Sequence, residues 1–212
     1  MGVPVTLAQA YELIFGSVLL NDWSARDIQA WEYVALGPFR AKVSATAISP
    51  WIVTREVLEP YREMTPPRVQ PLLPCLREPE AYNQDLALQI LLEPAGAAGA
   101  TSITRTNQRY TYYSSVQQLT HHAIGGCMMQ TGDLPGSGTI SGRTPDSLGS
   151  LLELSWTAHR PLALEGGEQH CFLEDGDEVS LRGACERDGL RIGFGRCDGS
   201  IHPALDPFLE HL

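Results

Sequence analysis

Residues 21–42 carry the side chains of this sequence that are best suited to chemistry. Asp22 follows an apolar run, and its carboxylate can either cap the helix predicted next or bind a divalent cation, which prefers oxygen ligands. The position of Asp22 in the sequence, taken alone, favours the role of a helix cap. Arg26, Gln29 and Tyr33 are three and four residues apart, so one helix face offers a guanidinium, an amide and a phenol. The same pattern is typical of a solvated amphipathic helix, which is the favoured interpretation of the spacing by itself.

Further candidates are ambiguous from their neighbours alone. Lys42 lies in a predicted loop, where a lone lysine is usually a surface charge. Glu153 alternates with leucines and a tryptophan, which predicts a half-buried strand over residues 152–156 with the glutamate on its polar face. Thr139 stands in a Ser-Gly-Thr-Ile-Ser-Gly stretch. His121 and His122 end a predicted helix, where we expect them to serve in capping and packing.

The elements that must position these side chains are short and separated by many turns. Ser114 and Gln117 have the spacing of a helix capping box, ahead of an apolar stripe at Val116, Leu119 and Ala123. The sequence predicts helices over residues 7–14, 24–33 and 115–124, strands over 15–20, 50–53, 85–92, 152–156, 179–181 and 191–197, a hairpin-type turn at Asp175–Gly176, and a proline-rich surface connection over 58–79. We therefore expect one mainly β (α+β) domain with a few peripheral helices.

Composition excludes several classes of protein. The formal net charge of −10 over 212 residues argues against a nucleic-acid partner. No apolar run approaches the length that spans a membrane, and the first twenty residues lack a basic segment and contain Glu12, unlike a signal peptide. The five cysteines are scattered, which favours reduced, buried thiols in a cytoplasmic protein. A helix that leads directly into a buried strand suggests that sequence is missing upstream.

Longer stretches of the chain carry more information than single residues. They are Asn-Asp-Trp-Ser-Ala-Arg-Asp-Ile-Gln (21–29), Trp-Glu-Tyr (31–33), Leu-Gly-Pro-Phe (36–39), Gln-Gln-Leu-Thr-His-His (117–122), Ser-Gly-Thr-Ile-Ser-Gly (137–142), residues 149–156, Asp-Gly-Asp-Glu-Val (175–179) and Arg-Ile-Gly-Phe-Gly (191–195). These stretches resemble the fumarylacetoacetase family and follow its order over essentially the whole chain. Two of them, 117–122 and 137–142, resemble its fumarylacetoacetase-type members more than the shorter acylpyruvase-type members.

The resemblance implies a mixed β-roll over residues 1–212, corresponding to the family's C-terminal domain and N-terminally truncated relative to it. It implies a cytoplasmic homodimer that binds a small β-diketo acid, neither nucleic acid nor membrane, and a divalent ion, Ca²⁺ and/or Mg²⁺. The implied reaction hydrolyses a carbon–carbon bond, converting fumarylacetoacetate to fumarate and acetoacetate at the end of tyrosine and phenylalanine catabolism. The family's catalytic histidine and three acidic ligands lie upstream of Met1, so we expect this chain alone to be weakly active or inactive. Alternatives are a non-catalytic dimerising remnant or paralogue, and an acylpyruvase-type hydrolase.

The resemblance also implies a role for each candidate residue. Alanines stand at positions 41 and 45, where the family has glycine, so a positive φ at either position would displace the lysine between them. In the implied site Asp22 is a metal ligand, Lys42 and Thr46 border a magnesium-type site, Arg26, Gln29 and Lys42 stabilise an oxyanion, Gln29, Tyr33 and Thr139 contact substrate, and Glu153 orients the histidine that activates water.

Overall fold

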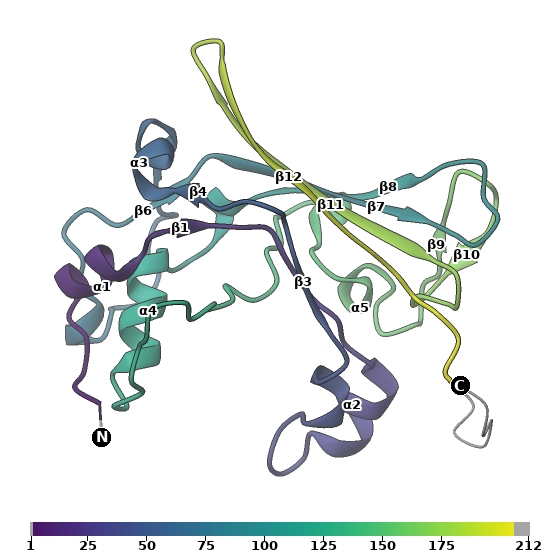
Figure 1. Cartoon of the computed structure of the whole chain (residues 1–212), viewed down its shortest axis with the longest axis horizontal. Helices are drawn as coiled ribbons and strands as arrows, with labels where there is room; N and C mark the ends of the chain where they lie inside the picture. Colours follow the sequence, from purple (N-terminus) through teal and green to yellow (C-terminus); the bar gives the residue numbers. More distant parts are fainter. Residues whose placement is uncertain (1, 206–212) are drawn as a thin grey trace.

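Four antiparallel strands form the largest sheet of the molecule (Figure 1). The computed structural model describes residues 2–205. The two-residue turn Asp188–Gly189 joins the last two strands, and both residues have positive φ, as a tight hairpin of this kind requires. The sheet has the order β12-β11-β7-β8, with bounds β7 (Leu86–Glu93), β8 (Thr101–Asn107), β11 (Glu178–Arg187) and β12 (Leu190–Ser200).

The predicted hairpin at Asp175–Gly176 is wrong in one respect. The pair does form a turn, with Gly176 at φ +92, but the strand after it pairs with β7 and β12. The strand before it, β10 (Gln169–His170), pairs instead with β9 (Leu162–Ala163). The turn therefore connects two sheets.

The main core lies between one face of the large sheet and the strands of the N-terminal half. Phe194 and Cys185 are fully buried in it, and Leu19 reaches it from the N-terminal half. A second cluster joins α1 (Leu7–Leu13) to α4 (Ser115–Ala123) through Ala10, Val116 and Leu119. The capping box of Ser114 and Gln117 and the apolar stripe of α4 are confirmed.

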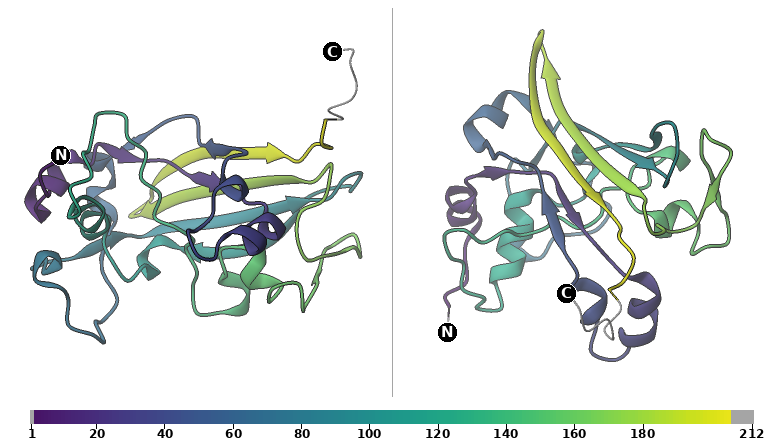
Figure 2. Two further views of the ribbon diagram at one scale, coloured as in Figure 1. Left: turned by 90° about the horizontal axis from the view of Figure 1, so that it is seen from below. Right: turned by 45° about the vertical axis from the view of Figure 1, so that its right-hand side comes forward.

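The predicted strand over residues 15–20 is divided in two because the chain changes its pairing partner. β1 (Gly16–Ser17) pairs with β4 (Val53–Thr54), whereas β2 (Leu20–Asp22) pairs with β3 (Thr46–Ile48). The ribbon of β2 and β3 carries α2 (Arg26–Glu32) and the 3-10 helix η1 (Arg40–Lys42) away from the main sheet, as the views of Figures 1 and 2 agree.

Residues 58–79 were predicted to be a surface connection, but they contain a paired strand. Arg62–Met64 forms β5, which pairs with β6 (Tyr82–Gln84), because the prolines flank this segment without interrupting it. The predicted strand over 50–53 begins only at Val53. The other short helices are α3 (Arg55–Leu58), η2 (Glu59–Tyr61), η3 (Pro74–Leu76), η4 (Gln108–Tyr110) and η5 (Pro145–Ser147).

The strand predicted over residues 152–156 is wrong. Leu151–Leu154 forms the helix α5, which Ser150 caps by accepting a hydrogen bond from the backbone N–H of Glu153 at 3.4 Å. Trp156, Thr157 and Ala158 follow with positive φ, which a strand does not contain. The Ser-x-x-Glu capping signal at residues 150–153 therefore predicts the observed helix better than the alternation of residues 152–156 predicts a strand.

The predicted mainly β (α+β) class is confirmed, with short helices at the margins of antiparallel sheets. No helix among residues 2–205 is long and apolar enough to cross a membrane.

Candidate functional site

The paired strands β2 and β3 bring Asp22, Lys42 and Thr46 together. Asp22 and Thr46 are directly opposite in the strand register. The ammonium Nζ of Lys42 lies 2.5 Å from Oδ2 of Asp22, with 28% of the lysine side chain exposed. Asp22 does not cap α2, whose N-cap is Ala25 without a side-chain hydrogen bond, so the capping interpretation is wrong.

Arg26 and Gln29 share one face of α2, as their spacing predicts. Nη1 of Arg26 donates to Oε1 of Gln29 at 2.8 Å, so the two side chains hold each other on that face. Tyr33 is the C-cap of the helix, with 53% of it exposed. The backbone N–H of Ala25 donates to the carbonyl of Ala41 at 3.0 Å, which ties the start of α2 to η1. The guanidinium, the amide and the Lys42 ammonium therefore come from two elements that are in contact.

Glu32 connects the same two elements and was missed by sequence reasoning. One carboxylate accepts the backbone N–H groups of Phe39 at 2.7 Å, Arg40 at 3.2 Å and Ala41 at 2.9 Å. The N–H of Ala41, followed by those of Phe39 and Arg40, lowers the pKa of Glu32 against the opposing effect of burial. The donors lie seven to nine residues further along the chain, so no local pattern indicated them.

Neither alanine beside the lysine strains the backbone, because Ala41 and Ala45 are absent from the positions with positive φ. Ala41 is fully buried in η1. The backbone strain that was expected to displace Lys42 is therefore absent, and Lys42 belongs to a 3-10 helix where a loop was predicted.

Glu153 lies on α5, where three serine contacts fix its carboxylate. Ser141 Oγ lies 2.9 Å from each carboxylate oxygen and Ser150 Oγ lies 3.0 Å from one. Thr139 is exposed on the preceding loop, and a Cβ at Gly149 would meet its methyl at 2.7 Å, so this close approach requires glycine. Among residues 2–205, no hydrogen bond joins Glu153 or Thr139 to the Asp22–Lys42 pair.

The family model described as fumarylacetoacetate (FAA) hydrolase C-terminal matches residues 2–201. The chain belongs to the fumarylacetoacetate hydrolase family. It is 50% identical over 204 residues to the fumarylacetoacetase of Arabidopsis thaliana and 48% identical over 207 residues to that of Homo sapiens. Fumarylacetoacetase fahA of Aspergillus fumigatus is 51% identical over 208 residues.

These alignments cover nearly all of this chain but only part of each relative. They include 96%, 98% and 97% of the chain, and 48%, 49% and 48% of the plant, human and fungal proteins, respectively. The chain therefore spans about half the length of the curated relatives it matches.

Members of the fumarylacetoacetate hydrolase family are generally metal-dependent. The oxygen atoms near Asp22 can therefore be compared with the ligands that a divalent ion requires. A calcium ion takes six to eight oxygen ligands, and magnesium requires near-octahedral coordination. Residues 2–205 contain no group of three or more His, Cys, Asp or Glu side chains that could hold a metal ion. Asp22 and Thr46 do not complete such a shell, and Lys42 already binds the carboxylate. The described residues thus do not form a full divalent-ion site.

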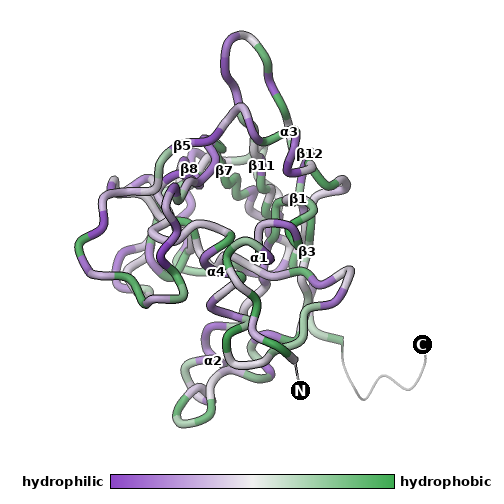
Figure 3. The backbone as a smooth tube through the Cα atoms, turned by 90° about the vertical axis from the view of Figure 1, so that its left-hand side faces the viewer, coloured by the Kyte–Doolittle hydropathy of each residue, from purple (hydrophilic) through white to green (hydrophobic). Residues whose placement is uncertain are grey.

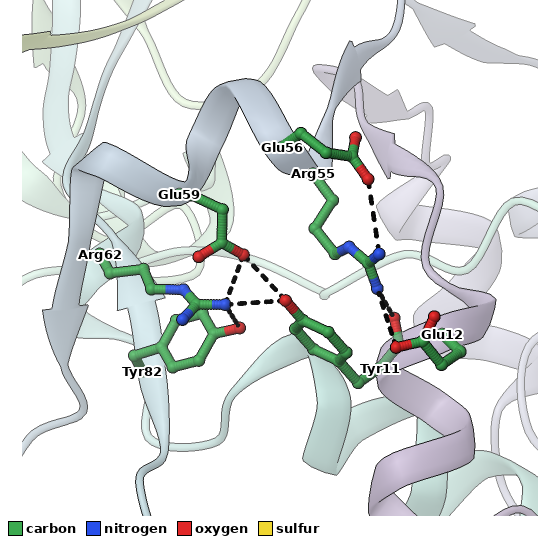
Figure 4. Close-up of polar contacts among 7 residues, drawn as sticks. All are labelled: Tyr11, Glu12, Arg55, Glu56, Glu59, Arg62 and Tyr82. Atoms are coloured by element: carbon green, nitrogen blue, oxygen red, sulfur yellow. Dashed lines mark hydrogen bonds and ion pairs between the residues drawn. The ribbon is translucent and has the colours of Figure 1, made fainter.

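A second polar cluster was not predicted from the sequence and joins α1 to η2 and β6 (Figure 4). Nη2 of Arg62 donates to the hydroxyl of Tyr11 at 3.0 Å and also contacts Glu59 and the hydroxyl of Tyr82. The Arg62 guanidinium carbon lies 3.7 Å from the centre of the Tyr82 ring. Burial raises the pKa of Tyr82 to about 12, although the arginine opposes this shift. These contacts link four elements, α1, η2, β5 and β6, so the role of the cluster is structural.

His121 and His122 are exposed in the last turn of α4, so the packing part of their predicted role is wrong. Nε2 of His122 lies 3.3 Å from Sγ of Cys127. All five cysteines are free, as expected, but only Cys185 and Cys197 are buried. Among residues 2–205, no hydrogen bond joins His121 or His122 to the Asp22–Lys42 pair.

Proposed function

We propose that this chain forms the C-terminal part of a fumarylacetoacetase active site and hydrolyses fumarylacetoacetate to fumarate and acetoacetate. The observation that supports this most directly is the pairing of Asp22 with Lys42 of η1, which contacts the helix that carries the Arg26–Gln29 pair. These residues occur in a chain about half identical to fumarylacetoacetases from a plant, a mammal and a fungus.

The proposed reaction requires stabilisation of a negative oxygen. Water adds to a carbonyl carbon of the β-diketone, the bond from that carbon to its neighbour breaks, and the neighbouring carbon takes a proton. The hydroxyl of water remains on fumarate, and the proton completes acetoacetate. Arg26, Gln29 and Lys42 are the proposed donors to the oxygen that becomes charged, and loss of one such donor typically lowers the rate about 10²–10³-fold.

The remaining candidate residues have proposed roles in binding and positioning. The substrate is an organic acid, which the cationic groups of Arg26 and Lys42 attract, and Tyr33 and Thr139 have exposed hydroxyls that can contact it. Glu153 is the proposed partner of the imidazole that activates water. A carboxylate has about four lone-pair sites, so its serine contacts leave room for one further donor. If a divalent ion binds, Asp22 would supply one oxygen ligand, and Lys42 and Thr46 would border a magnesium-type site.

The function is tested by incubating the purified chain, in excess over substrate and with Mg²⁺ or Ca²⁺, with fumarylacetoacetate and separately with an acylpyruvate. We expect equal amounts of fumarate and acetoacetate to form faster than in buffer, and faster than the acylpyruvate is cleaved. Faster cleavage of the acylpyruvate favours the acylpyruvase alternative. Absence of any acceleration over buffer contradicts the proposed activity of this chain and favours a non-catalytic domain.

A further inference from the structure

We propose that Glu32 is a positioning residue that holds Lys42 beside Asp22 by binding the backbone of η1. This inference rests on the proposed function only for its catalytic consequence. The geometry itself concerns three elements of the described chain: α2, η1 and the β2–β3 ribbon.

The contacts of Glu32 differ from those of an ordinary surface carboxylate. A surface glutamate usually pairs with a flexible cation, and such pairs contribute little. Glu32 instead accepts three successive backbone N–H groups, at 2.7, 3.2 and 2.9 Å. These are the N–H groups at the start of η1, which no carbonyl of that helix can satisfy. The carboxylate therefore fixes the backbone at the start of η1, and this in turn restricts where the side chains of η1 can lie.

Lys42 is the last residue of η1 and directly follows Ala41. The N–H of Ala41 donates to Glu32, and its carbonyl accepts from Ala25 at 3.0 Å. Both backbone polar groups of Ala41 are thus held, one by Glu32 of α2 and the other by Ala25, the N-cap residue of α2. From that backbone position Nζ of Lys42 lies 2.5 Å from Asp22 of the neighbouring strand.

The arrangement gives Glu32 a place in the proposed site without direct contact with substrate. Its helix, α2, also carries Arg26 and Gln29, whose side chains are hydrogen-bonded to each other at 2.8 Å. Glu32 fixes the spacing between those two donors and the ammonium of Lys42. A shift of about 1 Å in a catalytic group can lower a rate about 10²-fold, so this spacing matters if the donors act together.

The composition of the chain provides a specific readout. Lys42 is the only lysine among 212 residues; the other fourteen basic residues are arginines. Acylation of amines, measured by mass spectrometry, therefore reports on Lys42 and the N-terminal amine alone. A lysine amine held against a carboxylate reacts more slowly with an acylating reagent than a free lysine amine does. Cys185 and Cys197 are fully buried in the core, so their reactivity with a thiol reagent reports unfolding.

The variants are Glu32→Ala, which removes the acceptor, and Glu32→Gln, which keeps one uncharged acceptor oxygen. Asp27→Asn is the matched control, because Asp27 lies on the same helix and, within residues 2–205, its carboxylate accepts only from the N–H of Ile28, at 2.8 Å. Asp22→Asn gives the rate of Lys42 without its partner. We expect acylation of Lys42 to rise about three- to tenfold in Glu32→Ala, less in Glu32→Gln and not in Asp27→Asn, with both cysteines protected.

Two outcomes overturn the proposal. One is an unchanged Lys42 rate in Glu32→Ala while Asp22→Asn raises it. The other is exposure of Cys185 and Cys197 in both Glu32 variants, which assigns Glu32 to the stability of the whole fold. The labelling needs no hydrolytic activity, so absence of hydrolysis with the expected labelling pattern contradicts the proposed function and leaves the positioning role supported.

Discussion

At the residue scale, the proposed site depends on a few polar groups whose neighbours restrict them. Lys42 is held through both its side chain and its backbone, and Glu153 is held by serine hydroxyls. Fixed groups stabilise developing charge more effectively than mobile ones, because they need no reorganisation during the reaction.

Glu153 gives the first prediction at this scale. Glu153→Gln keeps the size of the side chain but removes the charge that stabilises an imidazolium. In a longer protein that also supplies the imidazole, the rate of fumarylacetoacetate hydrolysis should therefore fall about 10²–10⁴-fold. Glu168→Gln, at an exposed glutamate, should leave the rate unchanged. Single-turnover kinetics with protein in excess measures both. Equal rates in the Glu153 variant and the native form of that longer protein would rule out the proposed role.

Tyr82 gives a prediction of pH dependence. Its pKa in the folded chain is raised to about 12, above the ordinary value of about 10, chiefly by burial. The fold therefore favours the neutral phenol, a contribution that is present below about pH 10 and is lost as the pH rises toward 12. After allowance for solvent screening, we expect the free energy of unfolding to fall by about 1 kcal/mol more between pH 9 and pH 11.5 in the native chain than in Tyr82→Phe.

Urea titrations at the two pH values measure this difference. Tyr113→Phe, at an exposed tyrosine, is the matched control and should behave like the native chain. The same pH dependence in Tyr82→Phe and the native chain would show that this phenol does not contribute.

At the scale of elements, local signals predicted some structures well, and pairing decided others. Ser114 and Gln117 predicted the start of α4 because a capping box needs only four residues in sequence. The alternation around Glu153 was misleading, since five residues also fit one helical turn and Ser150 caps it. The division of residues 15–20 between β1 and β2 depends on strands more than about twenty residues away, which no local pattern contains.

The same distinction explains how much of the site could be predicted. The shared face of Arg26 and Gln29 follows from helical spacing alone. The contact of Asp22 with Lys42 spans twenty residues and requires the β2–β3 ribbon to form first. The resemblance to the family supplied their joint role, whereas the residues by themselves indicated a cap and a surface lysine.

The capping box of α4 gives a prediction at this scale. Ser114 is buried, accepts the N–H of Gln117 at 3.1 Å and donates to Glu78. Ser114→Ala should lower the free energy of unfolding by about 1–2 kcal/mol, because it leaves buried polar groups unsatisfied. Ser115→Ala, at the exposed first residue of the helix, should change it by less than about 0.5 kcal/mol. Similar values for the two variants in urea titrations would contradict the importance of the cap.

At the scale of the whole molecule, the protruding α2–η1 segment exposes several large apolar side chains, and parts of it have the hydrophobic colour in Figure 3. Trp31 is 89% exposed and Leu36 is 84% exposed, and Val34, Phe39 and Val43 extend this α2–η1 apolar surface. Contiguous exposed apolar surface usually marks an interaction site. The expected homodimer supplies an occupant for it, namely a second copy of the chain.

We therefore predict that the chain is dimeric at micromolar concentration and that Trp31→Glu lowers its affinity for itself at least about tenfold. Val69→Glu is the matched control, because Val69 is 90% exposed in the proline-rich segment. Light scattering coupled to size-exclusion chromatography gives the mass of each variant. A native chain that stays monomeric, or a Trp31 variant as dimeric as the native chain, contradicts this interface.

The central claim is that the Asn21 to Lys42 region supplies oxyanion-stabilising donors to a hydrolase site, and a matched pair of variants in η1 tests it most directly. Lys42→Met and Arg40→Met each remove one positive charge from the same 3-10 helix. We predict that single-turnover hydrolysis of fumarylacetoacetate slows about 10²-fold or more, toward the rate in buffer, in Lys42→Met, and changes less than about twofold in Arg40→Met. An equal effect of the two substitutions, or native-like hydrolysis by Lys42→Met, would contradict the claim.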